Sequence, residues 1–248
     1  MTDLPVDDLG TVYDGPRPVR RVVSLVPSLT EALVSVDRAA VVGATDWCTH
    51  PADLDVTRVR GTKNPDLAAI RALSPDVVVC TKEENRELDV RRLREAGVRV
   101  WVTDIETVPG AVASMERLLD VLGWPWPAWL LRSRELWCGP VPPVTARVAM
   151  PIWRDPWMVV GSSTFTGDLL RRLGWENVFA GHADRYPTLD LAAIDGAGAD
   201  VVLLPDEPYV FTADDGPEAF ARTPTRLVSG RLLTWYGPSL VEAATLAL

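Results

Sequence analysis

Tryptophan is the residue type whose positions in this sequence most suggest a binding site. The 248-residue chain has 10 tryptophans against four tyrosines and four phenylalanines. Four of them follow short apolar runs that we expect to be strands: Trp47, Trp153, Trp157 and Trp235. Connecting loops lie at the surface, where an indole offers a large flat apolar face with one N–H donor. We interpret these four as a wall for a bulky, flat or ring-shaped ligand. Packing of the loops over the protein cores, or of one lobe on another, is the alternative.

Polar side chains occupy two further strand ends. Lys82 and Glu83 come directly after the apolar run 77–81, and Lys63 and Asn64 precede an expected helix. In open parallel sheets the C-terminal ends of the strands border the ligand crevice, so these side chains are candidates for ligand contact. The alternative is a solvated helix start, where acidic residues interact favourably with the helix dipole.

Motifs of the common enzyme classes do not occur. The first predicted strand is not followed by GxGxxG, and the chain has no P-loop and no GxSxG. We interpret Gly161–Ser163 as a plain turn. His50 and His182 have no set of partners at metal-ligand spacing. The sequence therefore predicts no catalytic residue, no protein-held metal and no required cofactor.

The amino-acid composition argues against two classes of binding partner. A net charge of −9 and a pI near 4.8 argue against nucleic acid and against an anionic membrane surface. Apolar stretches are interrupted well before 18 residues, so no membrane span is expected. The acidic N-terminus lacks the pattern of a signal peptide, and the three cysteines are far apart without CxxC spacing. On these grounds we predict a cytoplasmic location.

A short motif occurs twice and fixes the architecture. Asp66–Ile70 and Asp190–Ile194 both read DLAAI, and each is followed five residues later by Asp-Val-Val, at Asp76–Val78 and Asp200–Val202. The offset, 190 − 66 = 124, is half the chain length. Apart from coincidence, the simplest interpretation is one helix–turn–strand unit in each of two similar halves.

Strand and helix patterns alternate along both halves, which is typical of α/β units with parallel sheets. Ser28 with Glu31 has capping-box spacing, and Asn64 with Pro65 suits a helix start. Strands are expected over 21–26, 41–44, 77–81, 98–103, 147–152, 177–180, 201–204 and within 227–234. Helices are expected over 28–36, 64–70, 83–96, 107–123, 128–137, 166–173, 189–194 and from 238.

These elements predict an α/β fold of two lobes. We divide the chain into an N-terminal lead-in (1–18), which we expect to be loose, an N-terminal α/β lobe (19–123), a bridging helix region (124–143) and a C-terminal α/β lobe (144–248). A ligand cleft is expected between the lobes. A second tryptophan cluster falls at the bridge, where we expect a structural role: Trp124, Trp126, Trp129 and Trp137.

The order of motifs over residues 20–240 resembles the helical-backbone (class III) periplasmic-type substrate-binding proteins of cobalamin, haem and ferric-siderophore import. The most similar branch is the cobalamin-binding-protein-like helical backbone metal receptors. The segments that carry the resemblance are Val23–Glu31, Val42–Trp47, His50–Pro51, Gly61–Leu67, Pro75–Val78, Lys82–Asn85, Pro151–Met158, Arg185–Pro187, Glu207–Tyr209 and Trp235–Gly237.

The resemblance implies two Rossmann-like lobes with parallel sheets, joined by one rigid helix, with the ligand between them. It also implies a set of cleft-lining residues: Pro27, Ser28, Trp47, Lys63, Asn64, Lys82 and Glu83 from the first lobe, and Trp153, Arg154, Trp157, Glu207 and Trp235 from the second. Arg154 and Lys63 would meet amide or carboxylate groups at the ligand's periphery. The implied ligand is a corrinoid first, with haem or a ferric siderophore as alternatives.

Three departures from the family pattern bear on partners. Importer-docking members carry a glutamate on each lobe, and the matching positions here are Ala68 and Ala192, which puts permease docking in doubt. The bridge between Pro127 and Gly139 has room for only a short helix. No export signal is evident.

We therefore expect a non-catalytic small-molecule receptor. The alternatives are the binding component of an ABC importer, or an enzyme on the same scaffold that uses Glu83, Glu84 or Asp155 as acid–base groups.

Overall fold

The computed structural model describes residues 4–248 and divides into two compact units, each with its own parallel sheet and core. Unit 1 contains the described residues up to 105, together with 111–134 and 236–238. Unit 2 contains 106–110, 135–235 and 239–248. Along the chain, α4 (Val108–Leu122) and α5 (Ala128–Trp137) each cross the division between the units.

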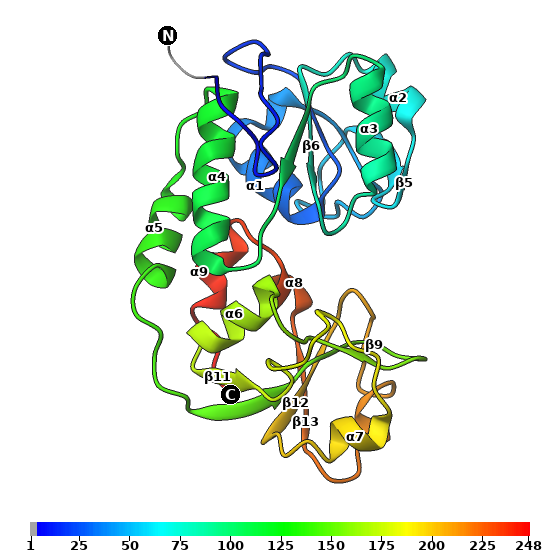
Figure 1. The fold of residues 1–248 in the computed structure, drawn as a ribbon, viewed down its shortest axis with the longest axis vertical. Helices are drawn as coiled ribbons and strands as arrows, with labels where there is room; N and C mark the ends of the chain where they lie inside the picture. The colour runs from blue at the N-terminus through cyan, green and yellow to red at the C-terminus, as the bar shows by residue number, and fades with distance from the viewer. Residues whose placement is uncertain (1–3) are drawn as a thin grey trace. The chain divides into compact units, whose positions relative to one another are not determined.

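Unit 1 is built on a five-stranded parallel sheet in the order β3-β2-β1-β6-β7 (Figure 1). The strands are β1 (Val22–Ser24), β2 (Val41–Ala44), β3 (Thr57–Arg58), β6 (Val77–Thr81) and β7 (Val100–Thr103). Strands β1, β6 and β7 are valine-rich and buried along their whole length, as expected for a sheet covered on both faces. The α/β class and the parallel sheet predicted from the sequence are confirmed.

Helices cover this sheet. One face packs on α2 (Leu67–Ala72) and α3 (Glu87–Glu95) through a core that includes Ile70, Val90 and Leu93. In Figure 1, α1 (Pro27–Asp37) and α4 lie on the other side of β6 from α2 and α3. A short 3-10 helix η1 (Arg38–Ala40) leads from α1 into β2, and a two-residue turn joins β4 (Arg60–Gly61) to β5 (Asn64–Pro65).

Several helix starts differ from the sequence prediction: α3 begins at Glu87 and not at residue 83, α7 (Leu191–Asp195) begins at Leu191 and not at residue 189, and α1 and α2 differ as well. Helix α1 begins at Pro27, since proline suits a first turn whose N–H groups have no partner, and Ser28 is buried without capping the helix. Asn64 lies in β5 opposite Gly61, and Asp66 caps α2 instead. Its Oδ1 accepts the N–H groups of Ala68 at 3.1 Å and Ala69 at 3.0 Å.

The N-terminal lead-in is firmly attached to unit 1 over its described part. The buried Asp7 carboxylate accepts backbone N–H groups from Leu9, Thr11 and Val102, and pairs with Arg94 at 3.0 Å. The expectation of a loose segment over 1–18 is therefore wrong for residues 4–18, and its first three residues lie outside the described part of the chain.

Unit 2 has a four-stranded parallel sheet in the order β11-β8-β12-β13 (Figure 1). Its strands are β8 (Ala146–Ala149), β11 (Trp175–Asn177), β12 (Val201–Pro205) and β13 (Thr225–Val228). An antiparallel ribbon, β9 (Pro151–Trp153) and β10 (Met158–Val159), follows β8. The helices are α6 (Phe165–Arg172), α7 (Leu191–Asp195), η2 (Pro217–Ala219), α8 (Gly230–Thr234) and α9 (Ser239–Ala243).

One strand in unit 2 is shorter than predicted. The expected strand 177–180 is wrong, because β11 ends at Asn177. The Asn177 amide donates to the Val160 carbonyl at 2.9 Å, and its Oδ1 accepts the Phe179 N–H at 3.1 Å. A buried asparagine that bonds its own backbone two residues on turns the chain out of the strand.

The two copies of the repeated motif occupy equivalent positions. Each gives a short helix followed by a central strand, α2–β6 in unit 1 and α7–β12 in unit 2. Asp76 Oδ2 accepts the Arg21 N–H at 2.9 Å beside the start of β1, and Asp200 Oδ2 accepts the Arg147 N–H at 2.7 Å beside β8. The motif therefore has the same structural role in both units.

Candidate functional site

The strand order of unit 1 has one switch point, between β1 and β6. From β1 the chain proceeds outward to β2 and β3, whereas from β6 it proceeds in the other direction to β7. Ligands of open α/β sheets bind outside the C-terminal strand ends at such a point. Pro27 and Ser28 follow β1, and Lys82 and Glu83 follow β6. The structure thus brings four predicted site residues to one place in unit 1.

Hydrogen bonds fix the loops at this switch point. Lys63 Nζ donates to the Glu83 carbonyl at 2.8 Å, and Lys82 Nζ pairs with Asp104 at 2.6 Å. Asn85, which sequence reasoning did not single out as a site residue, is buried between the loops. Its Oδ1 accepts the Thr81 N–H, and its amide donates to the Thr62 carbonyl at 3.0 Å. Asn85 thereby holds the Lys63 turn beside the end of β6.

Trp47 is the exposed aromatic residue of this edge, with 66% of its surface accessible. Its indole nitrogen lies 3.3 Å from where a side chain on Gly61 would begin, so the ring rests against the β4–β5 hairpin. Asn64 is exposed on the same hairpin, Pro27 is half-buried and Ser28 is buried. Trp47 therefore offers surface to a ligand, whereas Ser28 offers little.

Unit 2 has its own switch point, between β8 and β12, because β11 lies on one side of this pair and β13 on the other. The chain after β8 carries Trp153 and Arg154, and the chain after β12 carries Glu207. Trp153 is 43% exposed and meets Tyr209 edge-to-face, with ring centroids 5.7 Å apart. Three predicted site residues thus gather at the equivalent edge of unit 2.

Arg154 is held by carboxylates of its own unit. Its Nη1 donates to both Asp215 and Glu218, and Asp155 lies 3.8 Å from its Nε. The Glu218 carboxylate raises the pKa of Arg154, and Arg154 in turn lowers the pKa of Glu218. Tyr209 donates its hydroxyl to Asp215 at 2.7 Å. Two carboxylates therefore already offset the positive charge of Arg154.

Trp157 and Trp235 are buried, unlike Trp47 and Trp153. Trp157 is 9% exposed and belongs to the core of unit 2, where it stacks on Phe211 and meets Phe220 edge-to-face. Trp235 is 6% exposed, and its indole bonds the half-buried Glu207 carboxylate. Burial raises the pKa of Glu207, and the neighbouring Asp206 adds to this effect. The predicted aromatic wall therefore divides into two exposed and two packed residues.

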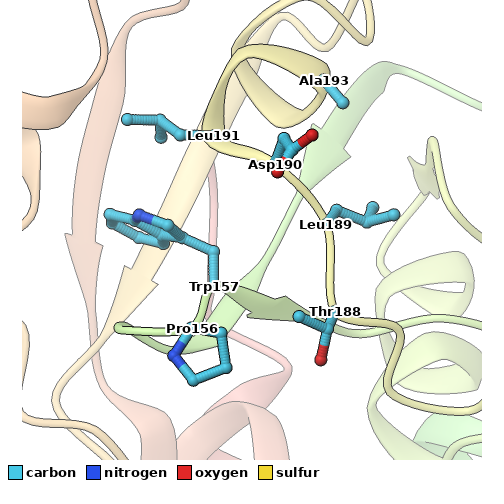
Figure 2. Close-up of a pocket in the computed structure, with 7 residues that line it drawn as sticks. All are labelled: Pro156, Trp157, Thr188, Leu189, Asp190, Leu191 and Ala193. Carbon is cyan, nitrogen blue, oxygen red and sulfur yellow. The ribbon is translucent and has the colours of Figure 1, made fainter.

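A cavity of about 440 Å³ lies beside Trp157, bounded by Pro156, residues 188–191 and Ala193 (Figure 2). Of the twelve predicted ligand-binding residues, only Trp157 lines it. The Trp157 ring already contacts Phe211, Phe220 and the Arg154 guanidinium, whose carbon lies 5.4 Å from the ring centroid. The cavity thus presents little free aromatic face on which a flat ligand could stack.

The bridge tryptophans are structural, as expected. Each indole N–H donates a hydrogen bond within the chain. Trp124 donates to the Val19 carbonyl and Trp137 to the Leu240 carbonyl, whereas Trp126 donates to Asp120 and Trp129 to Ser35. Ala68 and Ala192 are both exposed on their short helices. Within residues 4–248 no three His, Cys, Asp or Glu side chains gather as a metal site, and no helix is long and apolar enough to cross a membrane.

The known proteins that this chain resembles include binding proteins for vitamin B12 and for heme. The vitamin B12-binding protein of Salmonella typhimurium is 25% identical over 177 residues, which are 67% of this chain and 65% of that protein, slightly under two thirds of its length. The periplasmic heme-binding protein BhuT, solved with two hemes, matches with a TM-score of 0.73 and 25% identity over 91% of this chain and 95% of its own. No protein-family model matches.

A third relative supports the fold. The periplasmic vitamin B12-binding protein BtuF of Vibrio cholerae has a TM-score of 0.71 at 16% identity, over 92% of this chain and 95% of its own. The predicted cytoplasmic location is wrong, because four solved structures that match over nine tenths of the chain are named periplasmic proteins. An acidic N-terminus and widely spaced cysteines do not determine the cellular compartment of a protein. The two repeated units, the motif order and these likenesses together show that the chain is similar, in fold and in sequence, to the helical-backbone (class III) substrate-binding proteins.

Proposed function

We propose that this protein is a non-catalytic receptor that binds a metal chelate, a corrinoid first, at the C-terminal strand edges of its two units. The observation that carries the proposal is the pairing of an exposed tryptophan with a switch point in each unit. Trp47 stands 66% exposed at the edge of unit 1, and Trp153 stands 43% exposed at the edge of unit 2. Exposed indoles at a ligand crevice suit a large ring with apolar faces.

The relatives support this class of ligand. One is named for vitamin B12, another was solved with two hemes, and the relatives described above are named as binding proteins. A corrinoid is preferred over haem because the curated sequence relative binds vitamin B12 by name. No catalytic role is proposed for Glu83 or Asp155, which are exposed, or for Glu84.

A role as the binding component of an importer is the second proposal. The names of the solved relatives place them in the periplasm, where such components act. Ala68 and Ala192 lack the charge that the family resemblance leads one to expect for permease docking. Delivery would therefore use other contacts than the two expected glutamates, or the bound ligand would pass to a different acceptor.

Titration of tryptophan fluorescence tests the proposal. Purified protein is titrated with cyanocobalamin, haemin and a ferric siderophore, with correction for absorption by each ligand. We expect saturable binding of at least one chelate, with cyanocobalamin the tightest of the three. The Trp47→Ala and Trp153→Ala variants should weaken that binding, and Trp126→Ala, another indole change made away from both edges, should not. Absence of saturable binding by folded protein would refute the receptor proposal.

A further inference from the structure

Charge is distributed unevenly over the C-terminal strand edge of unit 2. The two segments that follow β9 and β12, residues 153–155 and 206–218, contain one basic and six acidic side chains. The basic one is Arg154, and the acidic ones are Asp155, Asp206, Glu207, Asp214, Asp215 and Glu218. A ligand at this edge therefore meets an excess of carboxylates.

The one arginine of these segments does not offset that excess. Asp215 and Glu218 both accept hydrogen bonds from Arg154 Nη1, and the guanidinium lies against the Trp157 ring. The side chain is 24% exposed, against 42% and 48% for the two acids. A ligand anion that approached Arg154 would also meet these two carboxylates, whose negative charge opposes its binding.

Four other basic groups near the strand ends are also paired or hydrogen-bonded. In unit 2, Arg185 pairs with Glu106, and Arg231 pairs with Glu242 at 2.9 Å. In unit 1, Lys82 pairs with Asp104, and Lys63 is bonded to the Glu83 carbonyl. Two arginines also lie there: Arg60 pairs with Asp66 at 3.6 Å, and Arg86 is exposed. Neither edge presents a cluster of free cations.

We propose that this receptor selects a neutral or cationic chelate and rejects an anionic one, with Arg154 neutralised by Asp215 and Glu218 so that it does not attract carboxylates. This inference rests on the proposed function and narrows its ligand class. A ring whose periphery carries amides fits the edge, because amides donate hydrogen bonds to carboxylates. A ring that carries ionised propionates meets like charge, which is costly at a binding surface.

Two ligands that differ by one charge test the proposal. Cyanocobalamin is neutral, and its monocarboxylate derivative has a single amide replaced by an ionised carboxylate. By calorimetry at low ionic strength and neutral pH, we expect the derivative to bind about fivefold more weakly or worse, and added salt to reduce the difference. Haemin, with two propionates, should bind more weakly than ferrioxamine B, a cationic ferric chelate.

Variants of the cluster assign the effect to its residues. Asp215→Asn with Glu218→Gln should free Arg154 and remove or reverse the preference, whereas Arg154→Gln should widen it. The matched control is Glu95→Gln with Glu176→Gln, two exposed carboxylates that pair with Arg91 and Arg147 elsewhere. The control should bind both corrinoids as the unmodified protein does. Thermal melts by circular dichroism confirm that each variant is folded.

The outcomes separate the two proposals. Binding of any chelate supports the receptor function, and weaker binding of its anionic partner supports the charge selection. Equal or tighter binding of the monocarboxylate, or of haemin over ferrioxamine B, would overturn the charge selection and leave the receptor function standing. The preference for the neutral chelate is to be compared in the unmodified protein, the Asp215/Glu218 variant and Arg154→Gln. If it is the same in all three, these residues do not have the proposed role. If no chelate binds, both proposals fail.

Discussion

At the scale of single residues, four tryptophans in similar loops have two different roles. Trp47 and Trp153 are exposed, whereas Trp157 and Trp235 pack into unit 2. The sequence could place all four after strands but could not tell them apart. The partners of Trp157 lie more than fifty residues away, at Phe211 and Phe220, and only the fold brings them together. The same holds for Arg154, whose two carboxylate partners come from the segment 215–218.

This division predicts different effects on stability. Trp157→Ala removes a buried ring from a packed core and should lower the free energy of unfolding by about 3–5 kcal/mol. Trp47→Ala removes an exposed ring and should change it by about 0.5 kcal/mol or less. Urea unfolding followed by circular dichroism compares the two variants. A large loss of stability in Trp47→Ala would show that this ring supports the fold and would weaken its assignment to a ligand.

At the scale of elements, valine-rich runs correctly predicted the central strands, and the helix that ends before Gly123 was predicted within a residue at each end. Helix starts were less predictable. Ser28 and Asn64 have the residue types of caps, but burial of one and the β4–β5 pairing of the other override that local preference. The lead-in looked loose because its anchor, Asp7, acts through Arg94 and Val102, which are distant in sequence.

The Asp7 anchor can be tested directly. Asp7→Ala leaves the N–H groups of Leu9, Thr11 and Val102 without their acceptor and Arg94 without its buried partner. The free energy of unfolding should fall by about 2–4 kcal/mol. Asp14→Ala is the control, since Asp14 forms an exposed pair with Arg99, and it should leave the urea midpoint unchanged. Equal effects in the two variants would contradict the anchoring role.

The segment 221–223 of unit 2 depends on one carboxylate at the end of α7. Burial raises the pKa of Asp195, but the backbone N–H donors of Thr223, Ala221 and Arg222 outweigh it and hold the pKa below its usual range. The lowered pKa means that the folded state favours the ionised form. The ionised Asp195 carboxylate therefore contributes fully to stability above the pKa of the unfolded state, about 3.9. This contribution is lost as the pH falls through the lower pKa of the folded state.

Asp195→Asn should accordingly lower the urea midpoint by the same amount throughout the range of about pH 5 to 8. Below about pH 4 the difference from the unmodified protein should shrink, because the native carboxyl also becomes protonated. Urea unfolding curves collected at several pH values measure this difference in midpoint. A difference that grows toward low pH would contradict the assigned role of Asp195.

At the scale of the whole molecule, the internal repeat was the most informative sequence feature. It predicted two similar α/β units. In each unit the aspartate of its Asp-Val-Val part accepts a backbone N–H group beside the neighbouring strand, β1 in unit 1 and β8 in unit 2. The motif order then indicated the resemblance to class III substrate-binding proteins, and the fold of the solved relatives agrees with it. The compartment was predicted wrongly, since composition reports it only indirectly. Ligand identity lies beyond the motifs, because it depends on which side chains at the strand edges remain exposed and unpaired.

Equilibrium dialysis against cyanocobalamin tests the receptor function most directly, because it counts bound ligand without relying on an optical change in the protein. We expect saturation near one corrinoid per chain, with a clear loss of affinity when Trp47 and Trp153 are both changed to alanine. Retention no greater than that of an unrelated acidic protein, by a sample with an intact cooperative unfolding transition, would contradict the assignment of a corrinoid as the first ligand.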